Sequence, residues 1–122
     1  MYRLRKNFRF ESSHQLMHHD GKCKRLHGHS WNGFIEVAGE SLFPDGPKQN
    51  MLVDYADLGK VTKAMEARLD HQHLNDILQS EMPTSEYLAK WIADEIRGQG
   101  FSNLFRVCIM ETCTSRCDYF PA

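Results

Sequence analysis

The sequence contains no apolar run long enough to cross a membrane and no surplus of either charge. The first absence argues against a membrane partner. The net charge of −1 gives no sign of the basic surface that nucleic-acid binding needs. Residues 1–6 also lack the apolar stretch of a signal peptide. Because the four cysteines come without an export signal, we expect free thiols in a reducing cytoplasm.

The remaining composition is that of an ordinary globular protein, with 41% apolar and 25% charged residues. A chain of 122 residues is long enough to form one domain with its own core. No internal repeat, low-complexity tract or linker interrupts it. We therefore expect a single domain over residues 1–122.

Alternating apolar residues predict strands at 2–12, at 27–37, around 105–109 and at 118–120. Apolar residues at helical spacing predict a helix that starts at an Asp54 N-cap and runs to about Leu69. A second predicted helix is capped by Thr84 or Ser85 and ends near Gly98. These segments outline the whole chain.

The predicted order is strand-strand-helix-helix-strand-strand, which indicates an α+β fold. The expected architecture is a four-stranded antiparallel sheet with two helices on one face. Such a sheet leaves its other face and its edges to be covered. We therefore expect an oligomer in which sheets join.

Three histidines give the clearest chemical signal. Side chains two positions apart on a strand point to the same face, so His27 and His29 direct two imidazoles to one point. His14 ends the first strand, and pairing the two strands would bring it alongside. Three histidines without a fourth protein ligand are typical of a catalytic zinc with an open position. Iron or copper, or coincidence among seven histidines, are the alternatives.

Cys23 precedes His27 by four residues and has cationic neighbours, Lys22, Lys24 and Arg25. Nearby cations favour the thiolate, which is the nucleophilic form. A thiolate beside an open metal site would serve as a base or a nucleophile. A buried small apolar residue and a fourth, structural ligand are the alternatives.

Three further residues are ionisable, and a functional role is one explanation for each. Asp70 and His71 follow the first helix, whose dipole favours a protonated imidazole; a helix cap with a solvated histidine is the alternative. Glu111 continues the apolar face of Phe105, Val107 and Ile109. A carboxylate there needs partners, such as a ligand with paired N–H donors, unless it reaches solvent at the strand end.

Together these residues resemble the 6-pyruvoyltetrahydropterin synthase / 6-carboxytetrahydropterin synthase family almost from end to end. The matching segments are 10–14, 23–30 (Cys-x-x-x-His-Gly-His-Ser), 52–55 with Leu58, 69–71 with 74–75, 83–86 and 111–112. The three-residue gap between Cys23 and His27 is similar to that of the bacterial carboxy-forming enzymes of queuosine biosynthesis. Pyruvoyl-forming members typically have a longer gap.

The resemblance implies a metal site and a base. His14, His27 and His29 would bind zinc, and Cys23 would abstract a proton. The implied fold is the tunnelling fold, assembled as trimers that stack into a homohexamer with active sites between subunits.

The resemblance also implies how the substrate is held and how protons move. Asp70 and His71 would form a relay that adjusts the protonation of Cys23. Glu111 would anchor the amino-pyrimidine edge of a pterin and could join the relay. Thr84 and Ser85 match the substrate-contacting segment of the family.

The implied activity is that of a carbon–oxygen and carbon–carbon lyase. It would convert 7,8-dihydroneopterin triphosphate to 6-carboxy-5,6,7,8-tetrahydropterin, with release of acetaldehyde and triphosphate. Lys24 and Arg25 are candidates for contacting the triphosphate. A pyruvoyl-forming or folate-branch member of the family is the alternative within it. Outside it are a non-catalytic zinc domain, in which Cys23 closes a four-ligand site, and a metal-assisted hydrolase.

Overall fold

The computed structural model describes residues 1–121 and has two 13-residue strands at the centre of one sheet. β1 (Tyr2–His14) pairs with β2 (His27–Gly39), β2 with β4 (Leu104–Thr112), and β4 with β5 (Ser115–Tyr119), all antiparallel. β3 (Gln72–His73) pairs parallel with the end of β1. Within residues 1–121 the sheet therefore has five strands, in the order β3-β1-β2-β4-β5.

The sequence prediction of four antiparallel strands is wrong by one strand. Since β3 has only two residues, it leaves no alternating pattern in the sequence. The last strand also lies earlier than predicted, at Ser115–Tyr119 instead of 118–120. The α+β class and the order of the longer elements are confirmed.

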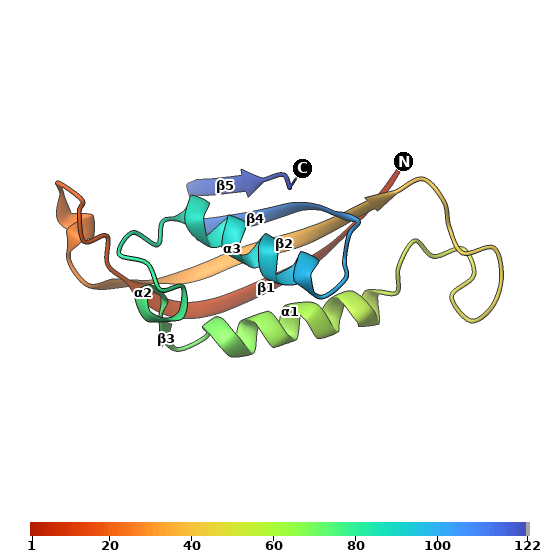
Figure 1. Cartoon of the computed structure of the whole chain (residues 1–122), viewed down its shortest axis with the longest axis horizontal. Helices are drawn as coiled ribbons and strands as arrows, with labels where there is room; N and C mark the ends of the chain where they lie inside the picture. Colours follow the sequence, from red (N-terminus) through yellow and green to blue (C-terminus); the bar gives the residue numbers. More distant parts are fainter. Residues whose placement is uncertain (122) are drawn as a thin grey trace.

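Two helices lie on the same face of the sheet, as predicted (Figure 1). α1 (Tyr55–Leu69) packs against β1, and α3 (Ser85–Gly98) packs against β4 and β5. The chain adds a short helix, α2 (Leu74–Ile77), and a 3₁₀ turn, η1 (Lys22–Lys24). In the part of the chain that is described, no helix is both long and apolar enough to cross a bilayer.

Side-chain caps explain where the two long helices begin. The Asp54 carboxylate accepts a hydrogen bond from the Ala56 N–H at 2.8 Å, which confirms the predicted N-cap. The Thr84 hydroxyl accepts one from the Tyr87 N–H at 3.1 Å. Thr84, and not Ser85, is therefore the cap of α3.

The core lies between the helices and the face that the predicted apolar residues of the strands share. Phe8 and Phe10 of β1 and Trp31, Ile35 and Val37 of β2 are all buried there. β4 differs from the prediction, because a bulge opposite the Glu36–Val37 step breaks its alternation. Leu104 consequently takes the core position expected for Phe105, whose ring packs instead against Arg3 and Phe120.

The opposite face of the sheet carries a buried carboxylate among arginines. Glu36 is 3% exposed and accepts hydrogen bonds from Arg106 at 2.9 Å, Arg3 at 2.8 Å and Arg5 at 3.4 Å. Burial alone would raise the pKa of Glu36, but the hydrogen bonds from Arg106 and Arg3 outweigh it and lower the pKa. This face is therefore held together by charge, in contrast to the apolar helical face.

Replacing Glu36 should destabilise the fold. Glu36→Ala leaves the Arg106 guanidinium buried without its main partner, at a cost of about 3 kcal/mol in the free energy of unfolding. Because the pKa of Glu36 lies below its ordinary value of 4.5, this contribution is present at neutral pH and is lost as the pH falls below that value. Denaturant unfolding at several pH values measures both effects.

The matched control is Glu40→Ala, since Glu40 is 73% exposed and pairs only with the chain's amino terminus among the described residues. Its effect should stay within about 0.5 kcal/mol. Equal stabilities of the two variants at neutral pH would contradict the role of Glu36.

Candidate metal centre

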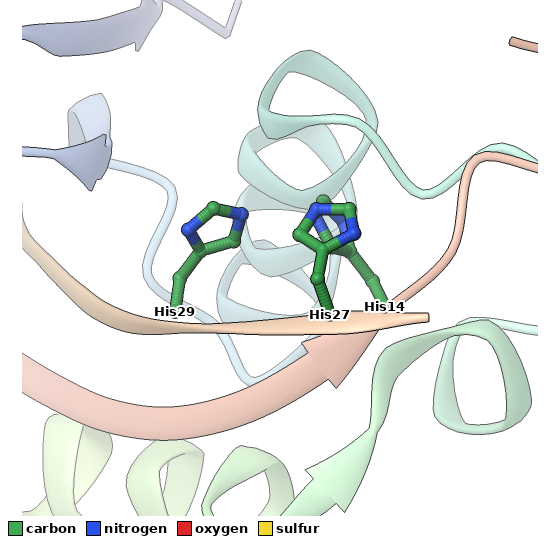
Figure 2. A group of neighbouring side chains, drawn as sticks. All are labelled: His14, His27 and His29. Carbon is green, nitrogen blue, oxygen red and sulfur yellow. The ribbon is translucent and has the colours of Figure 1, made fainter. Parts of the chain in front are cut away.

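Three imidazoles meet at the end of the β1–β2 pair, on its helical side (Figure 2). His14, His27 and His29 each offer one ligand nitrogen, and these atoms lie within 4.8 Å of one another. The ring centroids are 4.5 Å apart for His14 and His27 and 4.9 Å for His27 and His29. The predicted convergence of the three histidines is confirmed.

Strand register produces this geometry. His14 and His27 are direct partners across the β1–β2 ladder, and His29 lies diagonally across from His14, opposite Ser12. The indole of Trp31, two residues further along the same face, is fully buried and contacts both His14 and His29 edge-on at 5.1 Å. His14 and His29 therefore pack directly against a buried apolar ring.

Main-chain carbonyls set the tautomers of two histidines. His14 Nδ1–H donates to the carbonyl oxygen of Pro83 at 2.9 Å, and His27 Nδ1–H donates to that of Arg25 at 2.7 Å. Since a carbonyl can only accept, Nδ1 of each ring carries the proton and Nε2 keeps a free lone pair. This arrangement is typical of metal-binding histidines.

Two Nε2 atoms of the histidine group are buried and have no hydrogen-bond partner among the described residues. They belong to His14 and His29. Burial also lowers the pKa of both imidazoles, which keeps them neutral and ready to ligate. Buried unpaired nitrogens are costly, and a metal ion bound by the three rings would remove that cost.

Glu111 lies beside this group, as its place on β4 allows. Its Oε1 is 3.2 Å from His29 Nε2, without the alignment of a hydrogen bond, and its Oε2 accepts a hydrogen bond from the Ser85 hydroxyl at 3.0 Å. Ser85 thus contacts the carboxylate directly from the first turn of α3. Thr84 uses its hydroxyl oxygen to cap the same helix.

Cys23 is close to the same centre. It is half-buried in η1 and lines a hollow of about 550 Å³ together with His27, His29 and Glu111. It is not part of the three-residue ligand group. The arrangement puts a thiol next to three ligands without making it the fourth.

Asp70 and His71 lie between the end of α1 and the start of β3. They pair with each other at 2.9 Å, and the Asp70 carboxylate accepts a hydrogen bond from the Glu11 N–H at 2.8 Å. The hydrogen bond from the Glu11 N–H, followed by that from His71, lowers the pKa of Asp70. His71 lines a hollow with Glu11 and Ser13, while Cys23 lines a second one; His29 borders both hollows.

Two parts of the site escaped the sequence analysis, namely the Pro83 and Arg25 carbonyls that orient His14 and His27. Every residue has a carbonyl, so no residue type marks this role. The only signal in the sequence is proximity, since Arg25 lies two residues before His27.

This combination defines a class of protein, an α+β sheet protein with three histidines positioned to hold a metal ion beside a thiol. Residues 3–122 match the family model of 6-pyruvoyl tetrahydropterin synthase. The chain belongs to this family.

The relatives narrow the comparison. The chain is 43% identical to 6-carboxy-5,6,7,8-tetrahydropterin synthase of Synechocystis sp. over 98% of its own length and 94% of that protein. It is 29% identical to the Haemophilus influenzae protein of the same name, over 98% and 99% of the two chains. The names of the family and of these relatives indicate an enzyme of the tetrahydropterin synthase type.

Structural similarity confirms the tunnelling fold. The Caenorhabditis elegans 6-pyruvoyl tetrahydropterin synthase superposes with a TM-score of 0.84, at 23% identity, over 99% of this chain and 96% of that one.

Metal content should depend on each of the three histidines. His14→Ala, His27→Ala and His29→Ala each remove one of three ligands, so we expect metal affinity to fall at least about 100-fold. Elemental analysis after dialysis measures bound metal per chain. His18→Ala is the control, because His18 pairs with Glu81 outside the group. Full metal content in the trio variants would rule the site out.

Proposed function

We propose that the chain converts 7,8-dihydroneopterin triphosphate to 6-carboxy-5,6,7,8-tetrahydropterin, as a zinc-dependent lyase of the queuosine pathway formed by one domain over residues 1–122. The observation that carries the proposal is the group of three converging histidines, two of which keep a free Nε2 lone pair, beside a thiol and a carboxylate. The carboxy product is favoured by the names of the two relatives.

In this reaction the C1′–C2′ bond of the substrate side chain breaks and triphosphate leaves C3′. C1′ is oxidised to a carboxylate, while C2′ and C3′ leave as acetaldehyde, with C3′ reduced to its methyl group. This net two-electron oxidation of the side chain balances the two-electron reduction of the ring; one water is consumed and no redox cofactor is needed. Zinc, when bound, polarises the side-chain hydroxyls and makes the neighbouring C–H protons more acidic. The Cys23 thiolate removes such a proton as the general base.

Glu111 and α3 hold the pterin. The carboxylate accepts paired hydrogen bonds from the amino-pyrimidine edge of the ring, which fixes the reacting carbons near Cys23. Ser85 keeps Glu111 oriented through the hydrogen bond between them. Thr84 caps α3 with its hydroxyl oxygen, and its hydroxyl proton can donate a hydrogen bond to the substrate.

Asp70 and His71 act on the site of another subunit. In one chain His71 lines one hollow and Cys23 another, and His29 borders both. Because the family resemblance implies active sites between subunits, we assign the relay to a neighbouring copy. The sheet offers the surfaces for assembly, because the outer edge of β5 and most of the outer edge of β1 have no strand partner in residues 1–121. The proposed assembly is a homohexamer, built as a dimer of trimers.

The product distinguishes the carboxy reaction from the pyruvoyl reaction. With 7,8-dihydroneopterin triphosphate as substrate, the zinc-loaded chain should release acetaldehyde and 6-carboxy-5,6,7,8-tetrahydropterin in equal amounts. Mass spectrometry of the pterin and an alcohol dehydrogenase assay for acetaldehyde measure them. Accumulation of 6-pyruvoyltetrahydropterin without acetaldehyde would assign the chain to the pyruvoyl branch.

Complementation tests the shared site. Cys23→Ala and His71→Ala should each lower turnover by about 100-fold or more while retaining metal. After unfolding and refolding together, the mixture should recover up to about a quarter of the wild-type rate, since random assembly reunites both intact residues in about one site in four.

The control is each variant refolded alone. A mixture no more active than the single variants would mean that both residues act within one subunit. Loss of metal from Cys23→Ala would make Cys23 a ligand and favour the closed zinc domain instead.

A further inference from the structure

Three cations at the mouth of the site have no carboxylate partner. Lys22, Lys24 and Arg25 are exposed and make no ion pair within residues 1–121. Elsewhere the chain neutralises its arginines, as in the pairs of Arg68 with Glu95 and Arg106 with Glu36. Three unpaired cations within four residues form a local positive patch that the fold does not need, because exposed lysines and arginines stabilise little on their own.

The patch, defined as Lys22, Lys24 and Arg25, adjoins the metal site. Lys22 and Arg25 line the same hollow as Cys23, His27 and Glu111, and Lys24 flanks Cys23 in η1. The hollow, of about 550 Å³, has the capacity of a small-molecule site.

The groups around the hollow follow an order that begins just before β2 and ends on β4. Arg25 precedes His27, His29 comes next on the same face, and Glu111 lies 3.2 Å from His29. The two ends therefore have opposite charge, with the carboxylate at one end, the cations at the other and the metal ligands between them.

The patch is firmly attached to the metal ligands. The Arg25 carbonyl oxygen accepts the hydrogen bond that orients His27, and the Arg25 N–H donates to the Lys22 carbonyl at 3.0 Å. The Cys23 carbonyl accepts a hydrogen bond from the Leu16 N–H at 3.0 Å. The main chain of the turn is thus held, while the three charged side chains are free to close on a ligand.

We propose that Lys22, Lys24 and Arg25 form a binding subsite for the triphosphate and thereby set the direction in which the substrate lies. This inference rests on the proposed function. A pterin triphosphate has a ring with N–H donors at one end, a hydroxylated three-carbon chain in the middle and a polyanion at the other end. That order matches carboxylate, metal ligands and cations in the hollow, and the reverse orientation would bring the polyanion to Glu111.

The binding should be electrostatic and sensitive to salt. Arginine binds phosphate oxygens in a bidentate manner and lysines add point charges. Because all three side chains are exposed, their attraction is screened when ionic strength rises. The subsite should therefore mainly lower the KM for phosphorylated substrates, with little effect on kcat.

Inorganic tripolyphosphate is the direct probe. Calorimetric titration of the zinc-loaded protein should give an affinity that falls at least about 10-fold in the triple variant Lys22→Gln/Lys24→Gln/Arg25→Gln. The triple variant should also lose most of the salt dependence of binding. Zinc content is measured after each titration, because tripolyphosphate chelates divalent ions.

Lys63→Gln is the matched control, since Lys63 is an exposed lysine on α1 without an ion pair in the described chain. It should bind tripolyphosphate as the wild type does. The single variant Arg25→Gln, which preserves the carbonyl that orients His27, should give an intermediate loss with full zinc content. Circular dichroism of all variants verifies the fold.

Kinetics give a second readout. The triple variant should raise the KM for dihydroneopterin triphosphate more than the KM for the monophosphate. Unchanged tripolyphosphate affinity in the triple variant would overturn the subsite, as would an equal rise of both KM values. The calorimetric result holds whatever the product assay gives, so failure of the subsite is distinguishable from failure of the proposed function.

Discussion

The antiparallel pairing of β1 with β2 determines the position of the three histidines of the candidate metal site. Opposing His14 to His27 brings two imidazoles together at the end of the ladder, and the strand period of two adds His29 on the same face. A slip of one residue would turn β1's contribution to the opposite face. The buried aromatic residues Phe8, Phe10 and Trp31 oppose such a slip, because it would expose the core of β1.

Groups of different charge surround the histidines. On the helical face, burial lowers the pKa of the His14 and His29 imidazoles, which pack edge-on against Trp31 and are available to bind a cation. The neighbouring hollow is lined by the carboxylate of Glu111 and by Lys22 and Arg25, two cations without an ion pair among the described residues. A linear substrate with a hydrogen-bond donor at one end and negative charge at the other fits this arrangement in one direction only. In the proposed assembly, the Asp70–His71 pair of one subunit would complete the site of its neighbour.

Much of the fold was predictable because its signals are local. Alternation identified the core residues of β1 and β2, helical spacing identified α1, and short-range capping located Asp54 and limited the start of α3 to Thr84 or Ser85. The failures have a shared cause, since each depends on a distant segment. β3 exists only because Gln72 and His73 meet the end of β1, and the bulge that turns Phe105 out of the core arises in its pairing with β2.

The sequence by itself determined that His27 and His29 share a face, because imidazoles two positions apart on a strand point the same way whatever surrounds them. It also identified the family, through motifs whose order survives along the chain. Only the tertiary structure decided how these residues are grouped. His14 joins the site through a cross-strand contact, Glu111 reaches His29 from another strand, and Asp70 is hydrogen-bonded to the backbone of β1. These relations join residues far apart in the chain, and only folding creates them.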